Sequence, residues 1–391
     1  MRQPLIVIAA LALVAVRSAA AESEAQVFPT EAGDFRVVTV AEGLEHPWGL
    51  AFLPDGRALV TERPGRLRIL GTDAQLSAPV DGLPEVQVIN QGGLLDVAVD
   101  PDFSDTRWIY LSYAEPRGEK TNGTTVARAR LTANGLRDLE VIFRQVPAVE
   151  SGGHFGGRLV FARDGRLFVA LGERQAKPFS ELAQDLTTHF GKVVRIERDG
   201  RVPADNPFVG RAGVLPETWS LGHRNPQGAA LHPLTGELWL TEHGPRGGDE
   251  VNVARAGRNY GWPVIAYGLA YSGAKIGEGA RKAGLEQPVW FWLPSIAPSG
   301  LTFYTSDRIP AWTGNLFAGA LRGTLVSRLV LDGDRIIHEE RLFEGLQARI
   351  RDVRQGPEGL LYLLTDAPAG RILRIEPVHE ATPPEAKSAA P

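Results

Sequence analysis

The chain has 391 residues, a formal net charge of −4 at pH 7 and no cysteine. Its length is sufficient to bury a large core. The slightly acidic balance argues against a nucleic-acid partner, which would need a basic face. The lack of cysteine excludes disulfides and thiolate metal sites, so any metal would need oxygen or imidazole ligands.

Residues 1–21 have the features of a secretory signal peptide. Arg2 precedes an apolar run over residues 5–16, and small residues at 18–21 offer a cleavage site. The run is shorter than the ~20 apolar residues of a membrane-spanning helix, and no other stretch reaches that length. We therefore expect a protein without a membrane span that is periplasmic or secreted.

One pattern recurs between residues 22 and 377: a short apolar strand, a turn with Asp, Gly or Pro, and a second apolar or aromatic strand. The six predicted pairs cover residues 48–52 and 55–62, 94–99 and 107–113, 157–161 and 164–171, 227–231 and 235–241, 299–303 and 314–319, and 350–353 and 359–365. Six such hairpins predict an all-β fold, a six-bladed β-propeller over residues 22–377. A pair of β-sandwiches would lack this shared pattern. The tail, residues 378–391, is rich in Pro, Ala, Glu and Lys and is predicted to be disordered.

A propeller brings residues that are far apart in the sequence to the mouth of its central channel. Polar residues next to the strands of different blades are Gln91, His154, Arg224, Gly244, Arg322 and Arg349. The long connections over residues 177–214 and 268–290 are expected to build a binding face there.

His154 is the leading candidate for a catalytic base. Flanking glycines allow a sharp turn and a close approach of a ligand, and imidazole suits base chemistry near neutral pH. A His in a Gly-rich turn is by itself more often structural, so the surrounding residues decide.

Those surroundings are cationic: Arg224, Arg322, Arg349 and Arg351, with Asn225 as a further donor. Arg349 and Arg351 lie two residues apart and would share one face of a strand. Such a pair needs either an anionic ligand or neighbouring carboxylates between its charges. A ligand with several carboxylates would suit the set.

The loop over residues 242–250 is a candidate hard-cation site. Its Gly-Pro turn can direct carbonyl oxygens outward, and Asp249 and Glu250 add further oxygens of the kind that calcium prefers. The spacing does not match an EF-hand, and an ordinary polar turn is the default interpretation.

Several motifs in the same order resemble the soluble aldose sugar dehydrogenases that use pyrroloquinoline quinone (PQQ), a family of six-bladed propellers. The motifs lie at residues 91–95, 153–160, 221–227, 242–250, 259–263 and 349–353. The resemblance implies PQQ and calcium as cofactors, an aldose as substrate, a lactone as product and an external electron acceptor, either a quinone or a cytochrome.

The resemblance also implies roles for individual residues. His154 would be the base and Arg224 would stabilise the developing oxyanion. The cofactor would be bound by Gln91, Arg224, Asn225, Arg349 and Arg351, and also by Arg322, which takes the place of a lysine. The carbonyls of Gly244 and Pro245 would hold the cofactor's calcium, and the backbone of Glu250 and Tyr260 a second, structural calcium.

The chain departs from the glucose-specific pattern of that family. Gly153 stands where an acidic residue precedes the base, which puts tight glucose specificity in doubt, and His243 replaces an amide. Two other functions remain open: a calcium-dependent lactonase on the same fold, and a non-catalytic propeller that binds a partner or a glycan. The lactonase would need a metal held by a ring of carboxylate and amide side chains.

Overall fold

The computed structural model describes residues 26–175 and 178–378. The predicted signal peptide and all of the predicted tail except Val378 lie outside the described residues. Among the residues that the structure describes, no helix is long and apolar enough to cross a membrane.

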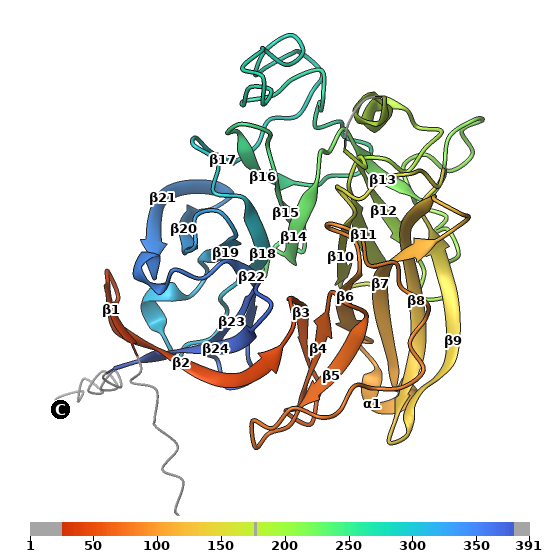
Figure 1. Ribbon diagram of the computed structural model, residues 1–391. Coiled ribbons are helices and arrows are strands. Elements are labelled where there is room, and N and C mark those ends of the chain that lie inside the picture. Colours follow the sequence, from red (N-terminus) through yellow and green to blue (C-terminus); the bar gives the residue numbers. More distant parts are fainter. Residues whose placement is uncertain (1–25, 176–177, 379–391) are drawn as a thin grey trace, which may run out of the picture.

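The described chain folds into six antiparallel sheets (Figure 1). From the innermost strand outward, the first sheet contains β3 (Pro47–Phe52), β4 (Ala58–Glu62) and β5 (Arg66–Leu70), and the second contains β6 (Leu94–Val99), β7 (Trp108–Pro116), β8 (Asn122–Thr132) and β9 (Gly135–Arg144). The third contains β10 (Gly156–Phe161), β11 (Leu167–Leu171), β12 (Lys192–Ile196) and β13 (Thr218–Leu221), and the fourth contains β14 (Pro226–Leu231), β15 (Leu238–Glu242), β16 (Asp249–Val253) and β17 (Trp290–Trp292). The fifth contains β18 (Pro298–Phe303), β19 (Leu316–Ala320), β20 (Val326–Asp332) and β21 (Arg335–Leu342), and the sixth contains β22 (Ile350–Gln355), β23 (Leu361–Thr365), β24 (Gly370–Pro377), β2 (Gly33–Leu44) and β1 (Gln26–Thr30). Short helical turns are α1 (Phe103–Thr106), η1 (Phe179–Gln184), η2 (Pro310–Trp312) and η3 (Glu344–Leu346).

The predicted six-bladed propeller is confirmed. Each predicted hairpin is the inner pair of one sheet: β3–β4, β6–β7, β10–β11, β14–β15, β18–β19 and β22–β23. The inner strands contact one another around a ring, including β22 with β3. The last sheet closes the ring, because β2 from the start of the propeller pairs with β24 from its end.

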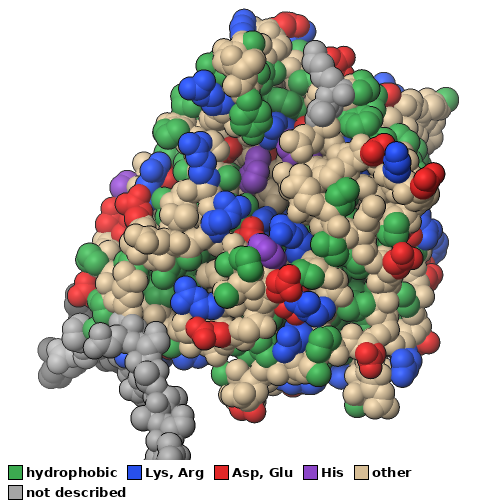
Figure 2. All heavy atoms as spheres, in the orientation of Figure 1, with side chains coloured by type: hydrophobic (Ala, Val, Ile, Leu, Met, Phe, Trp, Pro, Cys, Tyr) green, Lys and Arg blue, Asp and Glu red, His purple; other side chains and the backbone are tan. Residues whose placement is uncertain are grey.

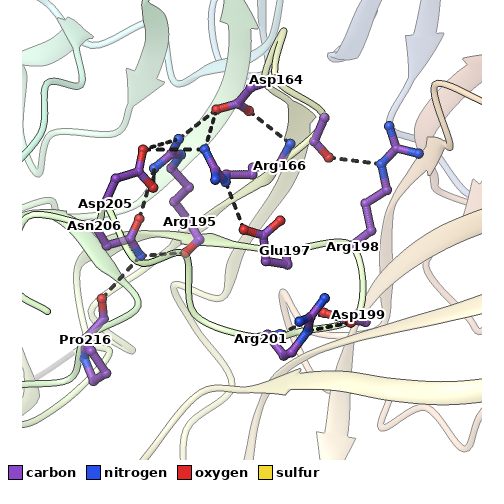
Figure 3. A network of polar contacts seen from close by, with 11 residues as sticks. Asp164, Arg166, Arg195, Glu197, Arg198, Asp199, Arg201, Asp205, Asn206 and Pro216 are labelled. Atoms are coloured by element: carbon purple, nitrogen blue, oxygen red, sulfur yellow. Dashed lines mark hydrogen bonds and ion pairs between the residues drawn. The ribbon is translucent and has the colours of Figure 1, made fainter.

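Burial explains why the inner strands were recognisable and the outer ones were not. Strands such as β11, β15 and β23 are buried along their whole length, so they read as continuous apolar runs. Half of the residues of the outer strand β21 are exposed, and the strand carries charged residues, which weakens its apolar pattern. Ion pairs also stabilise the blades. In the third blade they link the β10–β11 turn to β12 and to the loop that follows it, through Asp164, Arg166, Arg195, Glu197 and Asp205 (Figure 3).

One buried arginine joins the inner strands at the propeller axis. Arg158 on β10 pairs with Asp96 on β6 and with Asp352 on β22, each at 3.1 Å. Its Nε donates to the carbonyl of Gln227 on β14 at 2.6 Å, and its guanidinium lies 4.1 Å from the ring centre of Trp48 on β3. Arg158 is 1% exposed, so these partners together replace its hydration.

Replacing Arg158 by Met should lower the free energy of unfolding by about 3–5 kcal/mol, because two buried carboxylates would be left with Arg354 as their shared counter-ion. Urea unfolding measures the change. The matched control is Arg57→Met, which removes an exposed pair with Asp55 and should cost at most about 1 kcal/mol. Equal losses in the two variants would contradict the role given to Arg158.

Candidate active site

The predicted site residues meet at one end of the channel because they precede inner strands. Gln91 lies before β6, His154 before β10, Arg224 and Asn225 before β14, and Arg349 before β22. The backbone turns sharply at this end: residues with positive φ include His46, Asn90, His154 and Ala297, each a few residues ahead of an inner strand. Figure 2 shows Lys, Arg and His side chains gathered around a hollow in the middle of one face.

Two cavities open at this mouth. The larger has a volume of about 1020 Å³ and is lined by His154, Glu173, Arg224, Pro245 and Trp262, with further walls from η1 and residues 263–278. The smaller, which we term the arginine cavity, has a volume of about 280 Å³. Its polar lining residues are Arg63, Asn90, Gln91, Gln227, His243, Arg349, Arg351 and Asp366. The two cavities are adjacent, since the backbone N–H of His154 donates to Oε1 of Gln91 at 2.9 Å.

His154 is paired with a carboxylate that the sequence interpretation missed. Its Nδ1 lies 2.7 Å from Oε1 of Glu173, and both side chains are buried. The close approach depends on Gly172, where a Cβ atom would lie 2.1 Å from the His154 carbonyl oxygen. A pair of this kind fixes the imidazole and leaves Nε2 as the second ring nitrogen.

Burial governs the protonation of this pair. Burial, together with the Arg224 and Arg174 guanidinium groups, holds the pKa of His154 well below its usual value of 6.5. Burial also raises the pKa of the Glu173 carboxyl to about 7, against the opposing effect of Arg224. His154 is therefore neutral at neutral pH, which is the form that accepts a proton.

Arg224 connects the larger cavity to the 242–250 loop. Its backbone N–H donates to Oε2 of Glu242 at 2.8 Å, and its Nη1 donates to the carbonyls of His243 and Gly244, each at 2.9 Å. Its Nε is buried without a hydrogen-bond partner. Asn225 is buried behind it, where it accepts a hydrogen bond from Gln227, and it is not part of either cavity lining.

Asp366 lies between the two arginines near β22. It pairs with Arg351 at 2.7 Å and with Arg349 at 3.6 Å, while its other oxygen contacts Nδ1 of His46 at 2.7 Å. A protein carboxylate thus neutralises part of the positive charge of the Arg349–Arg351 pair. This is one of the two arrangements that the sequence predicted, the other being an anionic ligand. The hydrogen-bonding capacity of these arginines is not fully used, because the buried Nε of Arg351 has no hydrogen-bond partner. Arg322 is exposed and does not line either cavity.

The 242–250 loop is held by Asp249, whose oxygens are used within the protein. Oδ1 accepts from the N–H of Gly244, and Oδ2 accepts from Ser295, Ile296 and Ala297. The expectation that Asp249 offers a free oxygen to a metal is therefore replaced by a positioning role. It fixes the Gly244–Pro245 turn beside Arg224.

A third cavity of about 20 Å³ lies behind this turn, and its lining includes Gly244, Pro245, Glu250 and Tyr260. Burial and the neighbouring Glu242 raise the pKa of Glu250 to about 8. Asn252 donates to both carboxylates, and its own Oδ1 is buried without a partner. The part of the chain that the structure describes has no cluster of three or more His, Cys, Asp or Glu able to hold a metal. A cation here would therefore rely on carbonyl and amide oxygens as well.

These observations test whether the implied cofactors fit. The unpaired buried nitrogens of Arg224 and Arg351 call for acceptors, and a planar ligand with several carboxylates supplies them. The carbonyl oxygens of Gly244 and Pro245 are ligands of the type that calcium takes, although that of Gly244 also accepts from Arg224. The Glu242 and Glu250 carboxylates behind them are also of this type. The residues present fit both groups.

Sequence reasoning had a signal for the missed carboxylate. Four second strands end in, or are followed within two residues by, an acidic residue: Glu62, Glu173, Glu242 and Asp366. In each case the carboxylate accepts a hydrogen bond from, or pairs with, a residue ahead of an inner strand. Alignment of the hairpin repeats would have revealed this position.

The fold and its channel mouth define a propeller with an enclosed acid–base pair and an anion-binding side. A comparison with family models makes the assignment specific. The glucose/sorbosone dehydrogenase family matches residues 44–374, and the chain belongs to this family.

Relatives support the assignment over most of their length. The chain is 47% identical over 346 residues to the aldose sugar dehydrogenase YliI of Escherichia coli, covering 87% of this chain and 92% of that protein. The crystal structure of the soluble aldose sugar dehydrogenase of Escherichia coli superposes with a TM-score of 0.85, covering 88% of this chain and 99% of that one, at 47% identity. The PQQ-bound aldose sugar dehydrogenase of Streptomyces coelicolor gives a TM-score of 0.72 at 28% identity, covering 88% and 98%.

The buried His154–Glu173 pair predicts a histidine that resists protonation. Nitrogen-15 NMR of labelled protein should show a neutral His154 imidazole at pH 6.5, with protonation only well below that pH, because burial disfavours the imidazolium ion. Loss of the signal in His154→Gln assigns the resonance. Titration of His154 at or above pH 6.5 would contradict the structure.

Proposed function

We propose that the chain is a PQQ- and calcium-dependent dehydrogenase that oxidises the anomeric carbon of aldose sugars to lactones. Electrons would pass to an external acceptor, a quinone or a cytochrome, and the enzyme would act in the periplasm or outside the cell. The observation that carries the proposal is the buried His154–Glu173 pair, which faces a large cavity beside Arg224. Family membership supports the same class of reaction.

The residues of this chain divide the work among themselves. When bound, PQQ supplies a two-electron acceptor and calcium supplies a Lewis acid beside it. Nε2 of His154 takes the proton of the anomeric hydroxyl as the C1 hydrogen departs as hydride, while Glu173 holds Nδ1–H and so fixes the ring.

Other residues bind and orient the cofactor. Arg224 offers positive charge where an oxyanion develops. Arg349, Arg351 and Gln91 line the arginine cavity, which suits a carboxylate-rich ligand. Gly244 and Pro245 would present carbonyls to calcium, and Glu250 and Tyr260 would border the second calcium. Asn225 and Arg322 do not line either of the two cavities at the channel mouth, so their proposed cofactor contacts would need a shift of side chains.

The test is reconstitution of the purified protein with PQQ and calcium, with dye reduction measured on glucose, maltose and xylose. Activity should require both additions and fall by at least about 100-fold in His154→Ala, the loss expected for a general base. His338→Ala is the control, since His338 is an exposed residue that pairs with Glu31 at the outer edge of the propeller. A protein that takes up no PQQ but hydrolyses lactones with calcium alone would instead be the lactonase.

Glu173→Gln should reduce kcat by roughly 10- to 1000-fold with little change in KM, because Glu173 orients the base and does not hold the sugar. In the wild type, kcat/KM should rise with pH through about 7, where Glu173 loses its proton, and this limb should be absent in the variant. Glu217→Gln is the matched control: Glu217 also pairs with a histidine, His189 at 2.8 Å, away from both cavities. An unchanged profile in Glu173→Gln would contradict the positioning role.

A further inference from the structure

Arg63 is a lining residue of the arginine cavity that neither the motifs nor the family resemblance singled out. It directly follows Glu62, the last residue of β4, and it lies beside Gln91, Arg349 and Arg351 around the cavity. Its backbone is fixed on both sides: its N–H donates to the carbonyl of His46, and its carbonyl accepts from the N–H of Leu94, each at 3.0 Å. The side chain therefore starts from a defined position at the channel mouth.

Space for Arg63 is provided by a glycine on the neighbouring blade. A Cβ atom on Gly93 would lie 2.1 Å from the Arg63 carbonyl oxygen and 2.5 Å from its Cγ. Any other residue at position 93 would displace both the backbone and the side-chain stem of Arg63. The guanidinium is thus directed from a closely packed base into the cavity.

The arginine cavity carries more positive charge than its own acid can neutralise. Three guanidinium groups, from Arg63, Arg349 and Arg351, face Asp366, which is the one acidic residue in the lining. Both oxygens of Asp366 are already taken by His46, Arg349 and Arg351. Within the described part of the chain, the Arg63 side chain makes no hydrogen bond and no ion pair within 4 Å. Its charge acts on Asp366 only from a greater distance.

Uncompensated guanidinium groups around a small cavity raise the electrostatic potential there and favour an anion. Guanidinium binds carboxylate through two parallel hydrogen bonds, and a half-buried arginine whose side chain has no hydrogen-bonded protein partner can make them. The buried, unpaired Nε of Arg351 points to the same need. An arginine on the outer surface needs no protein partner, because water solvates it. Arg63 instead lines a cavity with a surplus of about two positive charges, where the lack of a hydrogen-bonded partner favours a bound anion.

We propose that Arg63 is a cofactor-binding residue: together with Arg349 and Arg351 it forms a three-arginine site that binds the carboxylates of PQQ. The proposal rests on the proposed function and adds a residue to it. Arg63, rather than the exposed Arg322, would be the third cation of this site.

Binding, measured apart from turnover, tests the proposal. PQQ is titrated into protein with calcium held constant, and quenching of tryptophan fluorescence is followed, since Trp48 lines the same cavity; equilibrium dialysis provides an independent value. Arg63→Gln should weaken PQQ binding by about 10- to 100-fold, the loss typical of one charge-assisted contact. Arg63→Lys should lie between the variant and the wild type, because it keeps the charge and loses the paired geometry.

The matched control is Arg57→Gln, which removes an equal charge from the same hairpin, where Arg57 pairs with Asp55 at the surface. Salt provides a second readout: raising NaCl from low to high concentration should weaken wild-type binding more than that of Arg63→Gln. Thermal unfolding checks that each variant is folded. If Arg63→Gln does not fold, the PQQ affinity of Arg63→Lys decides whether Arg63 binds the cofactor.

The outcomes separate the two proposals. If the wild type and Arg57→Gln bind PQQ and Arg63→Gln binds equally well with the same salt dependence, the role of Arg63 is wrong and the proposed function stands. If the wild type takes up no PQQ, both proposals fall. Weakened binding in Arg63→Gln, with partial recovery in Arg63→Lys, supports the three-arginine site.

Discussion

The guanidinium of Arg158 at the propeller axis is the interaction on which the rest of the molecule depends. Five of the six inner strands reach it, through Trp48, Asp96, Gln227, Asp352 and its own strand β10. Adjacent sheets pack face to face through apolar side chains, and their inner strands need a common point of registration at the axis. Arg158 supplies one, and because it also donates to the carbonyl of Arg351 it connects this axial network to the base of the arginine cavity.

Above that point, acidic residues at the ends of second strands hold the mouth in shape. Glu173 orients His154, Glu242 holds the backbone of Arg224, and Asp366 holds His46 and Arg351. Each carboxylate is buried, so its charge acts at short range with little screening. The site is therefore preorganised by the same repeat that builds the blades, which is a favourable basis for transition-state stabilisation.

The inner half of each blade could be predicted from the sequence because two buried strands and a polar turn leave a plain apolar pattern. His154, Arg224, Gln91 and the 349–351 pair were recognised because loops that precede inner strands carry unusual polar groups. The partners of these residues were not. Glu173 becomes a partner only when the end of β11 returns to the start of β10, and Asp366 reaches His46 only when the last blade meets the first. Arg63 becomes relevant only when separate blades share a cavity.

The position of Arg322 illustrates the same limit. The family resemblance places it beside a cofactor, but side-chain direction depends on the local turn. Here Leu321 lines the arginine cavity while Arg322 is exposed. Asp249 likewise had the right chemistry for a metal ligand. Its oxygens accept hydrogen bonds from four protein donors, and the spacing of residues in the sequence does not predict these bonds.

The closure of the ring has a consequence for how the molecule acquires its fold. β2 pairs with β24 over a separation of more than three hundred residues, with Val37 opposite Ile375. During synthesis from the N-terminus, the strands of the first five blades are made before β24, the partner of β2. Closing a loop of this length costs more entropy than pairing neighbouring strands, and non-local pairing of this kind slows folding. Until then β2 has an unpaired edge and the channel has a gap beside β3, where Arg63 and Asp366 line the same cavity. Assembly of the arginine cavity is thus tied to closure of the ring, because its lining comes from both the first and the last blade.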